Sequence, residues 1–241
     1  MSETIGLIEG AMRADADALR VIGQNIANSE VAAYRRQVAV SRSNFADEMQ
    51  SATIGQLAQS LDEKIVTDST PGTLKSTGEP LNLALEGNGF FVLQGPKGEV
   101  LTRRGDFRIS TDGMLVAASG ETVMGQEGAI QVGSATPQIE ADGSVRVGSD
   151  LIGQLRLANV ADANSLQYLG NGLYAAPGDL QQIDPGATLV RQGFLEGSNV
   201  EPVGEMVALM ETLRHFEGAQ RFVRGYDQLM EKAISELGKT E

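Results

Sequence analysis

His215 is the only histidine of the chain, and the chain contains no cysteine. A Ser-His-Asp triad would therefore have to use His215, and a metal site would have only carboxylates besides this one imidazole. His215 lies between Arg214 and Phe216, and the adjacent arginine indicates an exposed stretch of helix. We therefore expect neither catalysis nor metal binding at His215.

Two other patterns could carry chemistry, but both have simpler interpretations. Asp106, Asp112 and Asp142 each lie beside a glycine, which is typical of turns. The run Gly87 to Phe91 resembles a glycine-rich phosphate loop, but it leads into bulky strand-forming residues instead of a helix N-terminus. A carboxylate pair for glycoside hydrolysis could exist among the 32 acidic residues, yet nothing singles one out. We predict no catalytic or metal-binding residues and no cofactor.

The composition limits the possible partners. The net charge is −13, from 32 acidic and 19 basic residues. This excess of negative charge repels phosphate backbones and anionic lipids, so we expect no nucleic-acid binding. No apolar run approaches the ~20 residues of a membrane-spanning helix, and residues 1–10 do not resemble a secretory signal. We expect no membrane insertion, and export without a cleavable signal peptide if the chain leaves the cytoplasm.

The C-terminal stretch carries large apolar residues at intervals of seven. They are Leu209, Phe216, Val223, Met230 and Leu237. This spacing returns each residue to one face of a supercoiled helix, and Pro202 suits the first turn of that helix. A lone helix of this kind is marginal in water, so its apolar face requires a partner.

The N-terminal stretch supplies a matching pattern. Its residues at alternating steps of three and four are Ile5, Ile8, Met12, Asp15, Leu19, Ile22, Ile26 and Ser29. The pattern predicts a helix from about Thr4 to Asn28, and we expect it to pair with the C-terminal helix as a coiled coil. The alternative is an ordinary amphipathic helix that packs on a globular core.

The middle of the chain changes its period from helix to strand. Leu81, Leu83 and Leu85 alternate with smaller or polar residues, and glycine-containing turns then follow at short intervals, as expected for hairpins. We predict an α+β fold. Its parts are an N-terminal helix in residues 1–34, an extended arm in 35–79, a β-rich domain of short antiparallel strands in 80–195 and a C-terminal helix in 196–241.

Three stretches together resemble the rod and hook axial proteins of the bacterial flagellum. The first is Gln24 to Asn28 (QNIAN), and the second is Glu79 to Leu93 with the segments that follow it (LTRRGDF, DGMLV). The third is Glu196 to Val200 (EGSNV) with Glu205 to Val207. We take as the family signature Asn25, Ala27, Asn28, Gly87, Gly89, Phe90, Phe91, Gly197, Ser198 and Asn199.

The resemblance implies a structural rod subunit that is not an enzyme. The proximal-rod member is the most similar and the distal-rod member is the alternative. The family implies export as an unfolded chain by the flagellar type III apparatus, a place in the periplasmic part of the basal body, and other rod subunits as partners. It also implies little self-association in isolation. As the assembly interface we predict Ile5, Ile8, Met12, Leu19, Ile22, Ile26, Leu209, Leu213, Phe216, Val223, Met230 and Leu237.

The sequence departs from the family at one place. Before the aromatic Tyr34 the family has a glycine, whereas this chain has Ala33. Loss of this glycine removes the usual helix stop, so we expect the first helix to continue into Arg35 and Arg36.

Two other classes of protein remain open at this point. One is an extracytoplasmic carbohydrate-acting hydrolase with helical flanks. The other is an adaptor whose helices trimerise on their own, which sedimentation of the purified chain would distinguish from a rod subunit that is monomeric alone.

Overall fold

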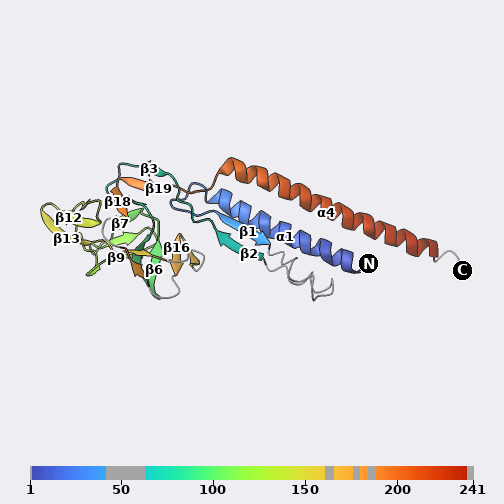
Figure 1. Ribbon diagram of the computed structural model, residues 1–241, viewed down its shortest axis with the longest axis horizontal. Coiled ribbons are helices and arrows are strands. Elements are labelled where there is room, and N and C mark those ends of the chain that lie inside the picture. Colours follow the sequence, from blue (N-terminus) through green and yellow to red (C-terminus); the bar gives the residue numbers. More distant parts are fainter. Residues whose placement is uncertain (1, 42–62, 161–165, 176–179, 184–187, 238–241) are drawn as a thin grey trace. The chain divides into compact units, whose positions relative to one another are not determined.

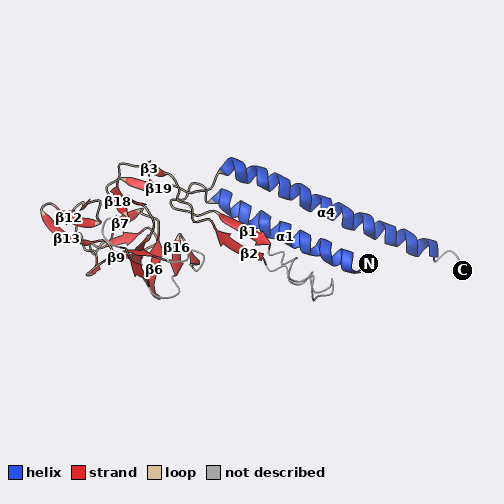
Figure 2. Cartoon of the chain, viewed as in Figure 1, coloured by secondary structure: helices blue, strands red, loops and turns tan. Residues whose placement is uncertain are grey.

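The computed structural model describes residues 2–41, 63–160, 166–175, 180–183 and 188–237. Helix α1 (Ser2–Ala27) and helix α4 (Pro202–Leu237) flank a series of antiparallel strands, which confirms the predicted α+β class (Figures 1 and 2). Residues 42–62 of the predicted arm lie outside the described residues.

The chain forms two compact units. We name Met1–Ala27, Gln37–Asp68 and Glu201–Glu241 the helical unit, and Asn28–Arg36 with Ser69–Val200 the β-rich unit. The helical unit contains α1, α4 and the hairpin of β1 and β2. The strands of both units are β1 (Gln37–Ser41), β2 (Glu63–Thr67), β3 (Leu74–Ser76), β4 (Leu83–Glu86), β5 (Phe90–Gly95), β6 (Gly98–Thr102), β7 (Phe107–Ile109), β8 (Leu115–Ala117), β9 (Thr122–Gly125), β10 (Gly128–Ala129), β11 (Gln138–Ile139), β12 (Ser144–Val147), β13 (Asp150–Gln154), β14 (Leu157–Asn159), β15 (Gln167–Gly170), β16 (Leu173–Ala175), β17 (Gln181–Gln182), β18 (Leu189–Gln192) and β19 (Phe194–Glu196).

In the helical unit, α1 and α4 lie side by side and run in opposite directions (Figure 1). Helix α4 begins at Pro202, as predicted, and the Glu205 N–H donates to the Glu201 carbonyl to close its first turn. Strands β1 and β2 pair antiparallel with Val38 opposite Val66, and β1 packs against α1. Neither helix is long and apolar enough to span a membrane.

The prediction that α1 continues into Arg35 and Arg36 is wrong. The helix ends at Ala27, and Ala33 adopts a left-handed backbone conformation with φ of 53°. Ala33 is buried, and its N–H donates to the Glu196 carbonyl at 2.8 Å. Tertiary contacts therefore hold an alanine in the conformation that glycine adopts without strain, and the helix stops although the glycine is missing.

Ala33 gives a first testable prediction. Ala33→Val should lower the free energy of unfolding of the β-rich unit by about 2–4 kcal/mol, because a β-branched side chain fits poorly both at positive φ and in a packed site. Ala33→Gly should stay within about 1 kcal/mol of wild type, since relief of strain offsets the lost methyl contact. Urea unfolding of the two variants measures the difference, and equal stability would contradict the backbone assignment.

In the β-rich unit, the largest sheet has the strand order β15-β16-β6-β5-β9-β8-β7. The predicted glycine turns are confirmed. Positive φ angles occur at Gly113, Gly120 and Gly143, which lie between β7 and β8, β8 and β9, and β11 and β12. They also occur at Gly98 and Gly128, which are the first residues of β6 and β10 after the turns from β5 and β9. These turns reverse the chain between neighbouring strands and produce the short antiparallel pairs that the sequence predicts.

The core of the β-rich unit lies on both faces of β5. Phe91 packs edge-to-face on Phe107 on one face, with ring centroids 5.1 Å apart, and Val92 packs with Leu101 and Tyr174 on the other. Burial raises the pKa of the Tyr174 phenol to about 12. A strand that is covered on both faces does not alternate between apolar and polar residues. This explains why β5 begins with a continuous run of apolar residues.

Candidate assembly surface

The predicted assembly residues lie on α1 and α4. On α1 the five from Ile8 onward are half-buried: Ile8, Met12, Leu19, Ile22 and Ile26. On α4 Leu209, Phe216 and Val223 are half-buried, whereas Leu213 and Met230 are exposed. Ile5 and Leu237 lie within the helical spans. The heptad face of α4 is thus partly covered within the chain itself.

Two polar pairs fix how α1 and α4 face each other. His215 Nδ1 lies 2.7 Å from Asp15 Oδ2, and Asn25 Nδ2 donates to Glu205 Oε2 at 3.1 Å. Ten residues separate the two α1 partners and ten separate the two α4 partners, as expected for straight antiparallel helices in one register. The side chain of His215 is largely exposed, which agrees with the prediction from its neighbouring arginine.

Asn25 joins three segments of the helical unit. Its amide group pairs with the backbone of Gln37, donating to the carbonyl at 2.8 Å and accepting from the N–H at 2.9 Å. The same Nδ2 donates to the Glu205 carboxylate. Asn25 is buried and connects the end of α1 to the start of β1 and to the first turn of α4. This geometry gives the asparagine of the family signature a physical role, since its amide presents an acceptor oxygen and a donor nitrogen side by side.

Asn25→Asp should destabilise the helical unit by about 2–3 kcal/mol. A carboxylate cannot donate to the Gln37 carbonyl, and it would place a second negative charge beside Glu205. The double variant Asn25→Asp with Glu205→Gln should recover part of the loss, because an amide then faces the new carboxylate. Far-UV circular dichroism during urea unfolding follows the helices, and a double variant weaker than the single one would argue against this pairing.

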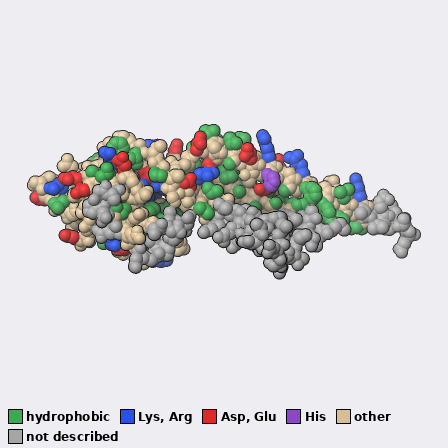
Figure 3. Space-filling model, viewed as in Figure 1, with side chains coloured by type: hydrophobic (Ala, Val, Ile, Leu, Met, Phe, Trp, Pro, Cys, Tyr) green, Lys and Arg blue, Asp and Glu red, His purple; other side chains and the backbone are tan. Residues whose placement is uncertain are grey.

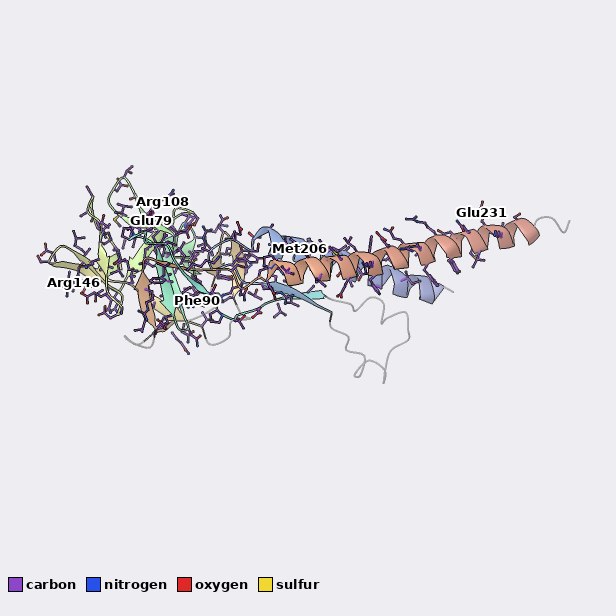
Figure 4. All side chains as sticks on the ribbon, turned by 90° about the horizontal axis from the view of Figure 1, so that it is seen from above. Glu79, Phe90, Arg108, Arg146, Met206 and Glu231 are labelled. Atoms are coloured by element: carbon purple, nitrogen blue, oxygen red, sulfur yellow. The ribbon has the colours of Figure 1, made fainter. Side chains whose placement is uncertain are left out.

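The predicted assembly residues include only Leu213 from a second apolar face of α4. Val203, Met206, Val207, Met210 and Leu213 are all exposed, by 41–69%. We name this set the outer stripe. Figure 3 shows hydrophobic side chains along the helical part of the molecule, and Figure 4 labels Met206 near the start of α4. Spacings of three and four between these residues would have revealed the stripe in the sequence.

In the β-rich unit, Glu196 lies at the centre of a buried cluster of charges. Its carboxylate contacts Arg35 Nη2 at 2.7 Å and Arg103 Nε at 2.9 Å, and it accepts the Gly72 N–H at 3.0 Å. The Glu196 side chain is 1% exposed. Arg35 also donates to the Thr70 carbonyl. One carboxylate therefore fixes three segments that are far apart in the sequence.

Arg103 extends this cluster to the glycine loop of the family signature. Its guanidinium donates to the carbonyls of Gly87 at 2.9 Å and Gly89 at 2.6 Å. Burial lowers the pKa of Arg103, and the charge of Glu196 opposes that effect. The loop that resembled a phosphate site thus presents its carbonyls to a cation of the same chain.

The segment after Glu196 is held by side chains of the signature. Asn199 Oδ1 accepts the Arg36 N–H at 2.6 Å, while Nδ2 donates to Thr70. Ser198 Oγ accepts the Val200 N–H at 3.1 Å. The structural roles of Glu196, Arg35 and Arg103 were missed by sequence reasoning, because their contacts depend on the path of the chain.

Within the described ranges, no group of three or more acidic or histidine side chains is placed to hold a metal ion. The charged residues described above form ion pairs and backbone contacts. This arrangement is suited to holding segments of chain together.

Comparison with known proteins agrees with these observations. Residues 191–236 match the family model of the flagellar basal body rod FlgEFG protein C-terminal region, and residues 84–147 match that of the flagellar hook protein FlgE/F/G D1 domain. The chain is 29% identical to the flagellar basal-body rod protein FlgF of Mesorhizobium japonicum, over 99% of both chains. It is 29% identical to FlgF of Salmonella typhimurium, over 95% of both chains. It is 30% identical to the rod protein FlgG of Buchnera aphidicola subsp. Schizaphis graminum, over 91% of this chain and 93% of that one.

Signature residues such as Asn25 and Asn199 act as structural joints. The family models and relatives that the chain matches are those of structural proteins, not enzymes. The chain belongs to the family of flagellar basal-body rod proteins and is FlgF-like. It is therefore a structural subunit of the rod, and the hydrolase alternative has no support.

Proposed function

We propose that this chain is a subunit of the proximal rod, and that it polymerises through its terminal helices to build the drive shaft of the flagellum. The alternative within the family is the distal rod, because both FlgF and FlgG proteins are similar to it. The observation that carries the proposal is the antiparallel pair of α1 and α4, whose C-terminal member keeps large apolar side chains exposed.

The two helices pair as a short coiled coil within each subunit. The half-buried heptad residues Leu209, Phe216 and Val223 support this pairing, since they lie on the side of α4 that carries the α1 contacts. Exposed apolar residues of α4 then supply contacts to neighbouring subunits. A helix pair that leaves so much apolar surface in water gains stability when neighbours cover that surface.

The partners of this chain are other rod subunits, proximal and distal, and the flagellar type III export apparatus. The absence of cysteine suits export as an unfolded chain, because no disulfide has to form or break. After export, the chain resides in the periplasmic part of the basal body.

Deletion of the gene and complementation with an epitope-tagged chain test this function. We expect the deletion strain to be non-motile and to lack complete rods in isolated basal bodies. The tagged chain should restore both, and antibody labelling should mark the cell-proximal end of the rod. Labelling at the hook side would select the distal-rod alternative, and normal rods in the deletion strain would refute the proposal.

Limited proteolysis of the dilute full chain provides a test in solution. The helical unit of an isolated subunit lacks its neighbours and is therefore the less stable of the two units. We expect cleavage of α1 and α4 before that of the β-rich unit, and a persistent fragment of the β-rich unit. The protein should sediment as a monomer. Protected helices in a dilute monomer, or a closed trimer, would contradict assembly-dependent ordering of the terminal helices.

A further inference from the structure

The helices of the helical unit differ in length. Helix α1 has 26 residues and α4 has 36 residues, a difference of roughly 15 Å at 1.5 Å per residue. The register set by Asp15 with His215 and by Asn25 with Glu205 places Ser2 level with Gln228. The part of α4 from Leu229 onward therefore extends past the start of α1 (Figures 1 and 4). We name Leu229–Leu237 the overhang.

The overhang carries exposed apolar side chains. Leu229 and Ile234 are each 67% exposed, and Met230 is 39% exposed. Met230 continues the heptad of Leu209, Phe216 and Val223, which are half-buried where α1 lies alongside. The apolar face that α1 covers along the first part of α4 thus continues past the N-terminal start of α1.

The outer stripe and the overhang point in opposite directions on the same helix. Val203 and Met230 are 27 residues apart, as are Val207 and Ile234. At 3.6 residues per turn this separation is about seven and a half turns, which places the two members of each pair on opposite sides of α4. At the start of α4, one apolar surface therefore faces away from α1. At the C-terminal end of α4, another apolar surface lies on the side of the helix that faces α1 further back.

Between Ile8 and Ala27, helix α1 offers no matching surface. From Ile8 to Ala27, none of its large apolar side chains is exposed. Within the described part of the helical unit, the exposed large apolar residues are those of α4 and Ile65 of β2. In the β-rich unit, Leu74, Leu151, Ile152 and Leu169 are also exposed. A second copy that covers the outer stripe with its helical unit therefore supplies apolar surface mainly from its own α4.

We propose that the overhang of one subunit packs on the outer stripe of a second copy of this chain, head to tail. The inference rests on the proposed function, because a shaft requires contacts that repeat without closing. The α4 helix of the second copy lies next to the overhang of the first copy, past the start of the first copy's α1. Its Val203 to Met210 face packs against that overhang. Since the two surfaces point in opposite directions, the second copy leaves its own overhang free for a third. This is a heterologous contact, which generates an open array.

The size of the contact explains why a pair of subunits is unstable alone. The outer stripe contributes five apolar side chains and the overhang three of described exposure, whereas stable interfaces use roughly 20–30 residues a side. A single contact is therefore weak, and it persists only where other contacts of the growing polymer act with it.

Disulfide cross-linking in assembled basal bodies tests the pairing, because the chain contains no cysteine of its own. Val207→Cys combined with Ile234→Cys should give a ladder of dimers, trimers and longer species on mild oxidation. Val207→Cys alone and Ile234→Cys alone should give no cross-linked copies of this chain. Glu211→Cys with Ile234→Cys is the matched control, since Glu211 is exposed but lies to one side of the outer stripe.

The outcomes separate this inference from the proposed function. Dimers formed by Val207→Cys alone would show that two outer stripes pair symmetrically, which would overturn the head-to-tail contact. Motile cells whose basal bodies contain the double variant without any ladder would also overturn it, although the chain would still be a rod subunit. Absence of the wild-type chain from basal bodies would instead refute the proposed function.

Discussion

Glu196→Ala should lower the free energy of unfolding of the β-rich unit by about 3–5 kcal/mol, the usual effect of removing one partner from a buried ion pair. The substitution leaves the buried guanidinium groups of Arg35 and Arg103 without their shared carboxylate. It also removes the acceptor of the Gly72 N–H. Urea unfolding of the full chain, followed by fluorescence of the tyrosines in the β-rich unit, measures the loss.

Glu86→Ala is the matched control for this experiment. Glu86 forms an ion pair with Arg191 at 2.7 Å, but both side chains are about half exposed. Exposed pairs contribute only ~0–1 kcal/mol, so the control should remain close to wild type. If the two alanine variants lost the same stability, the buried cluster would not hold the segments together as we describe.

Phe216→Asp should abolish rod assembly and motility while the β-rich unit remains folded. The phenylalanine is half-buried on the side of α4 that faces α1, and its burial contributes about 1.5–3 kcal/mol to the helix pair. An aspartate at this position adds the cost of removing a charge from water. Swarming in soft agar and electron microscopy of basal bodies report the effect on assembly.

Arg214→Asp introduces the same residue at an exposed position two residues away on α4. It should assemble, because it removes no apolar contact. Near-UV circular dichroism of both variants should resemble that of wild type, which would show that the β-rich unit is intact. Normal rods with Phe216→Asp would eliminate this residue from the assembly surface.

Much of the fold follows from local patterns in the sequence. Heptad spacing predicts α1 and α4, and Pro202 marks the first turn of α4. Turn glycines predict the hairpins of the β-rich unit, as at Gly113 and Gly143. These patterns succeed because helix periodicity and positive φ are properties of a few neighbouring residues.

The end of α1 shows where local reasoning fails. A missing glycine predicts a longer helix, yet the helix stops and Ala33 accepts a strained backbone. Its N–H is bound by the carbonyl of Glu196, and the side chain is buried. Contacts with a segment more than 150 residues away in the sequence therefore decide a conformation that the local propensity opposes.

The sequence by itself determined the class of this protein, its two terminal helices and the residues of the rod-protein signature. Only the tertiary structure decided what those residues do: that Asn25 pairs with the backbone of Gln37, and that Glu196 meets Arg103 across 93 residues of sequence. It also decided that α1 covers one face of α4 and leaves the outer stripe and the overhang exposed. Periodicity shows that a helix has apolar faces, but the path of the chain determines which face the same molecule covers and which remains for a neighbour.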